Sequence, residues 1–390
     1  MSHAGESLRT IRTDQVGSLP RPRWLAEKQA QFDAGTIGPE ELETVHRKAV
    51  SYLLERQEQI GFPILSDGEV TRRGFQESFG GAVSGFDSLP HRYSMDSGYP
   101  EPMPGGVDSS APPSLRVPSG TSDNGPAISR RRPTTDRLRL VRNVILEEYL
   151  RSSSLASTPV KVTLVGPDRI SQRFAHETSR AVYGDMDEFI ADVVAIEIQM
   201  IGEVVAAGCS YIQIDEPGYT AYVDAPSLAV MRGRGEDPAM NLARGIAADN
   251  ALRAPFPEVT FAIHICRGGG GGRGGPGFHR EGYYDAIAEQ LYNELSFDRF
   301  LLEYDSEASG SFESLRYLPN CKIAVLGLVS NHGEVETKDY IKRRLDEATN
   351  YFPVSQAALC PRCGFHAELD EEAVWGKLAL LQEVASEVWF

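Results

Sequence analysis

The chain has 390 residues, of which 41% are hydrophobic and 24% charged, enough apolar material for a large globular core. Its formal net charge of -16 argues against a nucleic-acid binder, and no apolar run is long enough to cross a membrane. The polar N-terminus does not have the pattern of a signal peptide, and the odd number of cysteines, five, indicates a reducing, cytoplasmic compartment.

Short apolar runs alternate with longer helical patterns from about residue 11 to the C-terminus. The predicted strands, in chain order, are residues 13–18, 63–69, 160–167, 211–217, 259–266, 299–305, 323–332 and 356–364. Predicted helices between them include residues 187–208 and 283–295. The first of these carries an inward-facing stripe with i, i+3, i+4 spacing, formed by Ile190, Val193, Val194, Glu197 and Ile201. Eight strands with intervening helices predict an α/β fold of the (β/α)8 TIM-barrel type.

Two regions interrupt this alternation. Residues 86–136 are rich in Pro, Gly and Ser and cannot bury much apolar surface, so they are predicted to be an insertion. Within it, residues 127–133 are a candidate strand or arm over the barrel mouth. Residues 267–277 form a glycine-rich loop, interpreted either as a lid or passage or as a lineage-specific insertion. The whole chain, 1–390, is expected to be a single catalytic domain.

Distinctive residues gather at the carboxyl ends of the predicted strands, where barrel enzymes build their sites. In chain order they are Gly17, Ser18, Asp67, Glu69, Asp215, Glu216, His264, Cys266, Glu303, Asp305, Asn331, His332 and Cys363. Random placement of polar residues would not collect them at one end so consistently, and we expect a functional site there.

A metal site is the chemistry that these residues favour. His264 and Cys266 are i and i+2 on a predicted strand, so their side chains share a face. Imidazole and thiolate both suit zinc, and Glu303 and Cys363 on later strands could converge on the same point to complete a tetrahedral set. His279, beyond the glycine-rich loop, is a less favoured substitute ligand.

The Cys360-x-x-Cys363 spacing allows a competing interpretation as a zinc ribbon or redox pair. No second CxxC exists, however, and strand alternation cannot point residues i and i+3 at one axis. Cys363 is preferred as the ligand because Gly364 follows it, where the backbone can approach the site closely. Cys209 and Cys321 are interpreted as incidental. Outside the cysteines, two carboxylates are candidates for orienting ligands or capping helices: Asp67 and Asp305.

Several motifs, taken as an ordered set, resemble the cobalamin-independent methionine synthases, in their catalytic barrel and in the shorter stand-alone relatives that include epoxide:coenzyme M transferase. They are "VGSLPRP", "SDGE", "QIDEP", "HIC", "LLEYDSEASGSFE", "GLVSNH" and "CPRCGF". The resemblance implies one Zn2+ ion held by His264, Cys266, Glu303 and Cys363. It also implies a pocket for an amino-acid thiol such as homocysteine, lined by Gly17, Ser18, Glu69 and Asp215. His332 matches a family histidine that assists protonation of the donor.

The methyl donor is left open by one departure from that family. The segment "VGPDRISQRF" lacks the tryptophan that stacks on folate in the synthases. Folate, methylcobalamin on a corrinoid partner protein, another methyl donor and an epoxide all remain candidates. Glu69 and Asp215 favour a cationic amino-acid thiol as the acceptor, whereas a sulfonate thiol would require arginines. The available ones are Arg21, Arg72, Arg73, Arg169, Arg173 and Arg267.

These observations predict a zinc-dependent transferase that moves a methyl or alkyl group to a thiol, as in methionine biosynthesis. Metal-bound sulfur is held as the nucleophilic thiolate, Glu69 and Asp215 hold the substrate ammonium, and His332 or Asp215 protonates the leaving group. The alternatives are epoxide opening or C–S bond cleavage with the same zinc, a non-catalytic barrel with a structural zinc, and a metal-free decarboxylase of the same superfamily. The expected partners are small molecules, and a homo-oligomer is compatible with the sequence.

Overall fold

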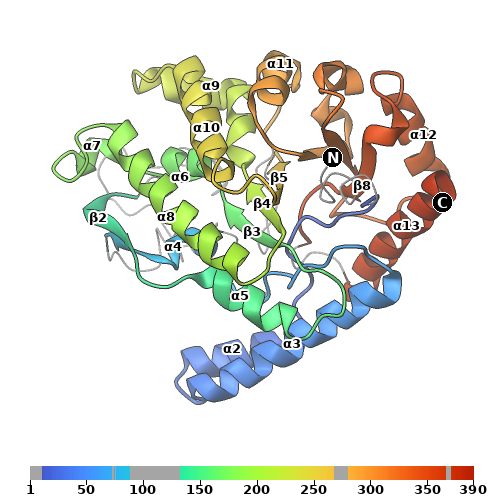
Figure 1. Cartoon of the computed structure of the whole chain (residues 1–390), viewed down its shortest axis with the longest axis horizontal. Coiled ribbons are helices and arrows are strands. Elements are labelled where there is room, and N and C mark those ends of the chain that lie inside the picture. The colour runs from blue at the N-terminus through green and yellow to red at the C-terminus, as the bar shows by residue number, and fades with distance from the viewer. Residues whose placement is uncertain (1–10, 73, 75, 88–131, 268–279, 366–369) are drawn as a thin grey trace, which may run out of the picture.

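A computed structural model describes the chain from residue 11 to residue 390, apart from residues 73, 75, 88–131, 268–279 and 366–369 (Figure 1). Most of the predicted insertion at 86–136 and of the glycine-rich loop at 267–277 therefore lies outside the described residues, as do His279 and Arg73. The interpretations placed on them stay predictions, as does the single domain. Within the described ranges, no helix has the length and apolar character needed to span a membrane.

A parallel sheet of six strands forms the centre of the molecule, and its strand order follows the chain. Every residue of these strands is buried, as expected for a parallel sheet covered on both faces. The strands are β3 (Val162–Val165), β4 (Tyr211–Asp215), β5 (Thr260–Ile265), β6 (Arg299–Glu303), β7 (Ile323–Val329) and β8 (Ala357–Pro361). The α/β class and six of the eight predicted strands are thus confirmed.

The first two predicted strands form single β-bridges instead. Thr13 pairs in parallel with Leu359 of β8, and Leu65 pairs in parallel with Val160, just before β3. One local reason is that the backbone turns at Gly68 and Glu69, whose φ values are 73° and 53°, and so cannot continue as an extended strand there. In the part of the chain that the structure describes, no bridge joins the segments 13–18 and 63–69, so a closed eight-stranded barrel stays a prediction.

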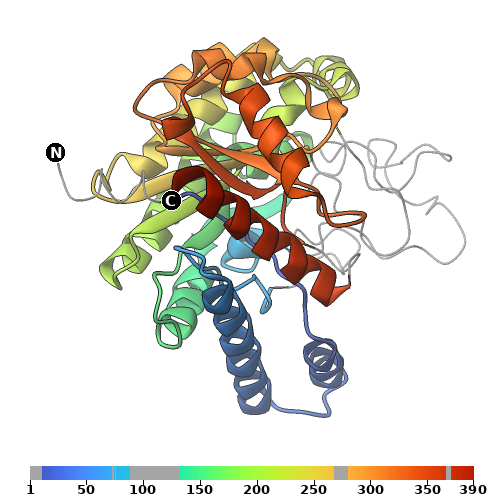
Figure 2. The same cartoon turned by 90° about the vertical axis from the view of Figure 1, so that its right-hand side faces the viewer.

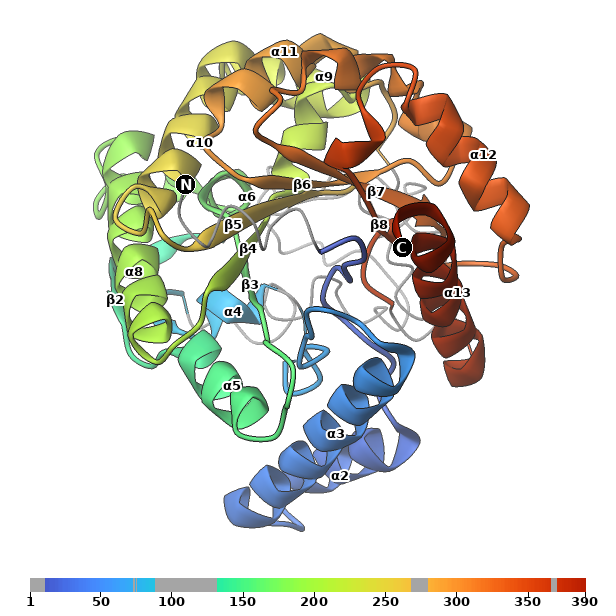
Figure 3. The same ribbon diagram turned by 45° about the vertical axis from the view of Figure 1, so that its right-hand side comes forward.

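Helices surround the outer face of this curved sheet (Figure 3). The longer ones are α2 (Arg23–Asp33), α3 (Pro39–Ile60), α5 (Val144–Ser153), α8 (Met186–Ala206), α9 (Ala225–Gly233), α10 (Pro238–Arg253), α11 (Asp285–Glu294), α12 (Lys338–Ala348) and α13 (Glu371–Trp389). The helices predicted at 187–208 and 283–295 correspond to α8 and α11. The stripe predicted for α8 is buried except for Val194, which is half-buried.

Shorter helices follow several strands at their carboxyl ends or lie in the connections. They are α4 (Glu77–Gly80), α6 (Pro167–Gln172), α7 (His176–Ser179), η4 (Pro217–Tyr222), η5 (Glu307–Ser309), η6 (Phe312–Tyr317) and η7 (Val354–Gln356). The last helix, α13, packs beside α3 near the start of the chain (Figure 2). There Tyr52 donates a hydrogen bond to Glu371 at 2.6 Å. The two ends of the described chain therefore lie next to each other.

Two strands outside the main sheet flank the predicted insertion. β1 (Val83–Phe86) and β2 (Thr134–Leu140) pair antiparallel, and β2 packs against α8. Arg132 forms a parallel bridge with Phe174. The arm predicted at 127–133 is described only at its last two residues, and the bridge at Arg132 attaches this end to the segment after α6.

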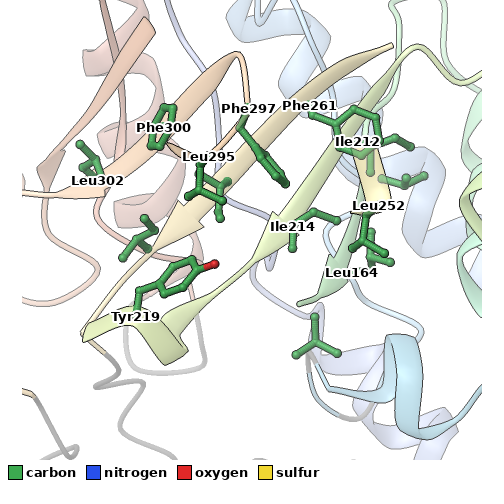
Figure 4. Packing of buried hydrophobic residues seen from close by; sticks show 14 of the residues in the cluster. Leu164, Ile212, Ile214, Tyr219, Leu252, Phe261, Leu295, Phe297, Phe300 and Leu302 are labelled. Carbon is green, nitrogen blue, oxygen red and sulfur yellow. The ribbon is translucent and has the colours of Figure 1, made fainter. Parts of the chain in front are cut away.

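The sheet has an apolar outer layer and a mixed inner face. Side chains such as Ile212 and Ile214 of β4 and Phe261 of β5 pack outward against the helices (Figure 4). A separate, smaller cluster of apolar side chains includes Tyr211 and Ala262 from the same two strands. Because side chains alternate along a strand, the residues two and four positions beyond Tyr211 share its face. The polar residues Gln213 and Asp215 therefore lie on the inner face, between the inner apolar cluster and the carboxyl end of β4.

Candidate metal and substrate site

Three predicted metal ligands come together at the carboxyl end of the sheet. One ligand atom from each of His264, Cys266 and Cys363 lies within 4.8 Å of the other two. His264 is the penultimate residue of β5, Cys266 follows that strand, and Cys363 follows β8. His264 and Cys266 are only 3% and 5% exposed. One imidazole and two thiols so close together form a donor set that suits zinc.

The orientation of His264 also fits a metal ligand. Its Nδ1 lies 3.3 Å from Asp215 Oδ1, at the end of the neighbouring strand β4. Its Nε2 is buried and has no hydrogen-bond partner among the described residues. Metal-binding histidines commonly use one ring nitrogen for the metal and engage a carboxylate with the other. Asp215, predicted as a substrate and catalytic residue, therefore also has a position from which it would orient His264.

The charges in this group indicate that a cation would be stabilised there. Burial alone would lower the pKa of His264, but the adjacent Cys266 and Asp215 raise it to about 10. A hydrogen bond with Cys266, burial and the charges of Cys266 and Glu303 raise the pKa of Cys363 well above its usual value. Proton retention by these side chains relieves the crowding of negative charge, and a divalent cation would do the same.

Glu303, the fourth predicted ligand, is fully buried at the end of β6 but lies outside the three-residue group. Its Oε2 accepts a hydrogen bond from the backbone N–H of Arg267 at 2.8 Å. Its Oε1 is 3.6 Å from Nη1 of Arg362, which also contacts Asp305 Oδ2 at 3.2 Å. Glu303 is thus close to the group and held by other partners, and its role as a ligand stays a prediction.

The choice between the two cysteines of the CxxC pair agrees with the geometry. Cys360 belongs to the inner apolar cluster, and its Sγ contacts the carbonyl oxygen of Val325 at 3.6 Å. Burial raises the pKa of Cys360, which keeps it a thiol. Cys209 is buried, Cys321 is exposed, and neither belongs to the three-residue group.

The predicted substrate-pocket residues form a second, contiguous cluster. Glu69 accepts hydrogen bonds from Ser18 Oγ and, at 2.7 Å, from Thr163 Oγ1. A side chain at Gly17 would bring its Cβ within 2.6 Å of Glu69 Oε1, so the carboxylate requires glycine there. A Cβ at Gly364 would likewise lie 2.9 Å from Ser18 Cβ. The close backbone approach expected after Cys363 is therefore present.

Asp215 lies between the two clusters. Burial raises the pKa of Asp215, the contact with His264 opposes that shift, and the charge of Glu69 adds to it. Gln213 Nε2 donates to Asp215 Oδ1 at 2.7 Å and to the carbonyl oxygen of Val16 at 2.6 Å. Gln213 was not among the predicted site residues, although its position two residues before Asp215 on one strand places both on the same face.

The remaining predicted positions have local contacts. The backbone N–H of His332 donates to Ser330 Oγ at 3.2 Å, and His332 lies outside the three-residue group. Asp67 accepts from the backbone N–H of Glu69 at 2.9 Å, a contact within a turn and not at the start of a helix, so its suggested role stays a prediction. The buried Arg280 and Arg362 near the site were not predicted as site residues. Arg362 stands within the "CPRCGF" motif, but an arginine in a sequence carries no signal of its own burial.

Comparisons with known proteins place the similarity of this chain among the cobalamin-independent methionine synthases. Residues 11–117 match the family model described as the catalytic domain of the cobalamin-independent synthase. The chain is 28% identical over 389 residues to the Bacillus subtilis protein YxjH, covering 97% of this chain and 95% of that protein. It is 25% identical over 370 residues to methionine synthase of Pyrococcus abyssi, covering 94% and 89%.

Solved structures with the same fold span nearly the whole chain. One from Listeria monocytogenes, provisionally assigned as a vitamin-B12-independent methionine synthase, has a TM-score of 0.72 at 21% identity and covers 97% of this chain and 98% of its own. A B12-independent methionine synthase from Shewanella, in complex with selenomethionine, has a TM-score of 0.68 at 20% identity, with 97% of each chain covered. At these identities the similarity concerns the fold.

Proposed function

Because the chain belongs to the superfamily of the cobalamin-independent methionine synthases, we propose that it transfers a methyl or alkyl group to a thiol, with Zn2+ at the three-residue group. The observation that carries the proposal is the convergence of His264, Cys266 and Cys363 within 4.8 Å. Methionine synthases among the relatives support homocysteine as the acceptor. Glu303 would be the fourth ligand.

The mechanism assigns separate tasks to the two clusters. Zinc, when bound, would lower the pKa of the substrate thiol and so supply its nucleophilic thiolate form. Glu69 and Asp215 would hold the substrate ammonium, and the hydrogen bonds from Ser18 and Thr163 keep the Glu69 carboxylate in one orientation. The sulfur then forms a bond to the methyl or alkyl carbon while the bond from that carbon to its leaving group breaks.

Proton delivery completes the transfer. His332 or Asp215 would give its proton to the leaving group, and bulk water would restore it. The Glu303 carboxylate accepts a hydrogen bond from the backbone N–H of Arg267 and forms an ion pair with the Arg362 side chain. These contacts would stabilise the Glu303 carboxylate if an incoming sulfur displaced it as a ligand.

We further propose that residues 1–390 form one catalytic domain and that the two bridged segments, 13–18 and 63–69, close the sheet into a barrel.

An epoxide:thiol transferase or a C–S lyase is the second candidate function. It would use the same metal group and the same activated sulfur. The buried Arg169 and Arg280, which interact with the charge of Cys266, favour it because they would suit a thiol that carries an anion. A structural zinc is the third candidate, and it would be closed to added thiols.

Metal analysis combined with X-ray absorption spectroscopy tests these candidates. We expect about one zinc per chain and an additional sulfur neighbour when a substrate thiol is added. The spectra are compared with homocysteine, cysteine and coenzyme M, so the thiol that adds the scatterer identifies the acceptor. A zinc environment that none of the three thiols changes would contradict the transferase and support a structural zinc.

A cysteine variant tests the ligand set independently. Cys363→Ser should abolish zinc retention, because it removes one of the two thiolates in the group. Cys321→Ser is the matched control, since Cys321 is exposed and lies outside the group. Full zinc content in Cys363→Ser would remove that residue from the ligand set.

A further inference from the structure

Two buried arginines, Arg169 and Arg280, lie close enough to interact with the charge of Cys266, and a third, Arg173, lies close to Arg169. Arg169 belongs to α6, Arg173 follows this helix, and Arg280 follows the glycine-rich loop after β5. Their exposed fractions are only 6%, 6% and 2%. Burial and the positive charges of Arg173 and Arg280 lower the pKa of Arg169 well below its usual value, so Arg169 is close enough to each of the other two to be repelled by it.

Part of the hydrogen-bonding capacity of Arg169 is unused in the part of the chain that the structure describes. Its Nε and Nη1 are buried without a hydrogen-bond partner among those residues. A guanidinium group keeps its proton in proteins. Removing an unpaired ion from water costs several kcal/mol. The cost of burying the Arg169 guanidinium therefore destabilises the protein unless a ligand binds to its unsatisfied nitrogens.

Arg72 shows how the same chain treats a buried arginine with a structural role. It is 2% exposed, and its Nε and Nη2 donate to the Glu148 carboxylate at 2.8 and 2.6 Å. Nη1 and Nη2 also donate to the hydroxyl and carbonyl oxygens of Thr163 at 3.2 and 2.6 Å. Burial alone therefore does not explain the unpaired atoms of Arg169, because this chain is able to supply a carboxylate where it needs one.

The acidic groups nearest to Arg169 direct their oxygens to other donors. Glu216 accepts from the backbone N–H groups of Asp168 and Arg169 at 2.8 and 3.0 Å. Asp168 accepts from Tyr222 and Gln172 at 2.7 and 2.9 Å. Glu216 therefore faces the backbone of Arg169, while Nε and Nη1 of the Arg169 side chain have no hydrogen bond to a described residue.

A short chain of contacts connects the arginines to the metal group. Arg280 Nη1 lies 3.1 Å from Thr220 Oγ1, which donates to the carbonyl oxygen of Cys266 at 2.9 Å. The backbone N–H of Arg280 donates to the carbonyl oxygen of Arg267 at 2.9 Å. The charge of Cys266 acts on both Arg169 and Arg280. An anion bound here would therefore lie next to the metal group.

We propose that Arg169, Arg173 and Arg280 bind a carboxylate or sulfonate group of the substrate whose reacting atom lies at the metal group. This assignment rests on the proposed function and adds the class of substrate to it. Planar guanidinium groups bind oxyanions with paired hydrogen bonds, which also restrict the orientation of the molecule. The anion belongs either to the acceptor thiol or to the donor, and both sources share the same chemistry.

Calorimetric titration of the zinc-loaded protein tests the proposal. The thiol ligands are 2-mercaptoethanesulfonate, homocysteine and, as the uncharged comparison, 2-mercaptoethanol; the donor ligand is 5-methyltetrahydrofolate. Arg169→Gln should weaken binding of the anionic ligand at least tenfold and leave 2-mercaptoethanol unchanged. Weakening confined to the thiols or to the folate assigns the anion to that substrate. Unchanged affinity for every anionic ligand would overturn the proposal.

A stability measurement separates this role from a structural one. If the buried Arg169 guanidinium destabilises the protein until an anion binds, Arg169→Gln should raise the melting temperature of the ligand-free protein. The same variant should reduce the stabilisation of the protein by sodium sulfate. Arg173→Gln should reduce the same stabilisation, and Arg139→Gln, at an exposed position on β2, should change neither quantity. A lower melting temperature in Arg169→Gln with unchanged sulfate stabilisation would show a structural residue.

The outcomes distinguish this proposal from the proposed function. Sulfate stabilisation is measured without turnover, and it does not require zinc. If zinc is retained in Cys363→Ser and no thiol reaches the metal, the transferase assignment fails while the anion site stands. If zinc and thiol behave as expected but Arg169→Gln binds all anionic ligands normally, the anion site alone fails.

Discussion

Two groups of buried polar residues on the inner face of the sheet differ in how completely they are paired. In the inner group, Lys161 Nζ donates to Asp14 Oδ1 and Gln213 Oε1 at 2.6 Å each, and Tyr211 donates to Asp14 Oδ2. Arg299 Nε donates to the Tyr211 hydroxyl at 3.1 Å. At the carboxyl end, His264 Nε2 and Asp67 Oδ2 are equally buried, but no described residue pairs with them.

Buried polar atoms are almost always hydrogen-bonded, so an unsatisfied atom at a strand end requires an explanation. Binding of the proposed zinc would supply it for His264 Nε2. Gln213 connects the two groups, because it accepts from Lys161 and donates to Asp215, the partner of His264. Through Gln213, the inner group thereby restricts the orientation of Asp215 and His264 at the candidate metal site.

The largest expected effect comes from breaking the paired group. Lys161→Met removes one charge and leaves Asp14 buried with reduced compensation, which should lower the free energy of unfolding by about 3–5 kcal/mol. Urea denaturation measures this. Lys338→Met is the control, because Lys338 pairs with Glu383 and Glu387 on the surface, and its loss should cost at most about 1 kcal/mol. Equal stability of the two variants would contradict the comparison.

The next effect concerns an incompletely paired acid at the carboxyl end. Burial and the charge of Glu148 raise the pKa of Asp67 to about 7. A raised pKa contributes stability below the unfolded value near 4, and this contribution is lost as pH rises through 7. Asp67→Asn does not titrate, so its stability relative to the native chain should increase between pH 4 and pH 8 by up to about 4 kcal/mol.

Denaturant unfolding at several pH values measures that change. Asn can still accept the hydrogen bond from the backbone of Glu69, so the local turn should persist. Asp33→Asn provides the control, since Asp33 is an exposed acid at the end of α2. A constant stability difference between Asp67→Asn and the native chain across this pH range would show that Asp67 titrates normally.

The smallest effect is on metal affinity through a positioning residue. Asp215→Asn should keep the approximate shape of the side chain but weaken the orientation of His264, lowering zinc affinity about 10- to 100-fold. Competition with a chromophoric chelator measures it. Asp298→Asn is the matched control, since Asp298 precedes β6 at the other end of the strand and pairs with Arg253 instead of His264. Equal zinc affinity of both variants would remove Asp215 from the support of His264.

Much of the fold followed from periodicity in the sequence. Continuous apolar runs identified β3 to β8, because strands buried on both faces need apolar side chains throughout. The segments 13–18 and 63–69 were also predicted as strands, but they are less apolar and form only single bridges. Their hydrogen bonding depends on neighbours far away in the chain, such as Leu359 and Val160, and on the turn at Gly68 and Glu69, which a local pattern does not reveal.

For the site, the sequence by itself determined which residue types stand at the strand ends and which of them share a face, since strand alternation is a local property. The sequence predicted His264, Cys266, Glu303 and Cys363 as ligands, and the structure brings three of them, all except Glu303, within 4.8 Å of one another. Only the tertiary structure decided which polar atoms keep a partner: Arg72 is paired with Glu148, whereas Nε and Nη1 of Arg169 have no hydrogen bond to any described residue. Pairing depends on every neighbour in space, and those neighbours come from separate strands that meet only in the folded chain.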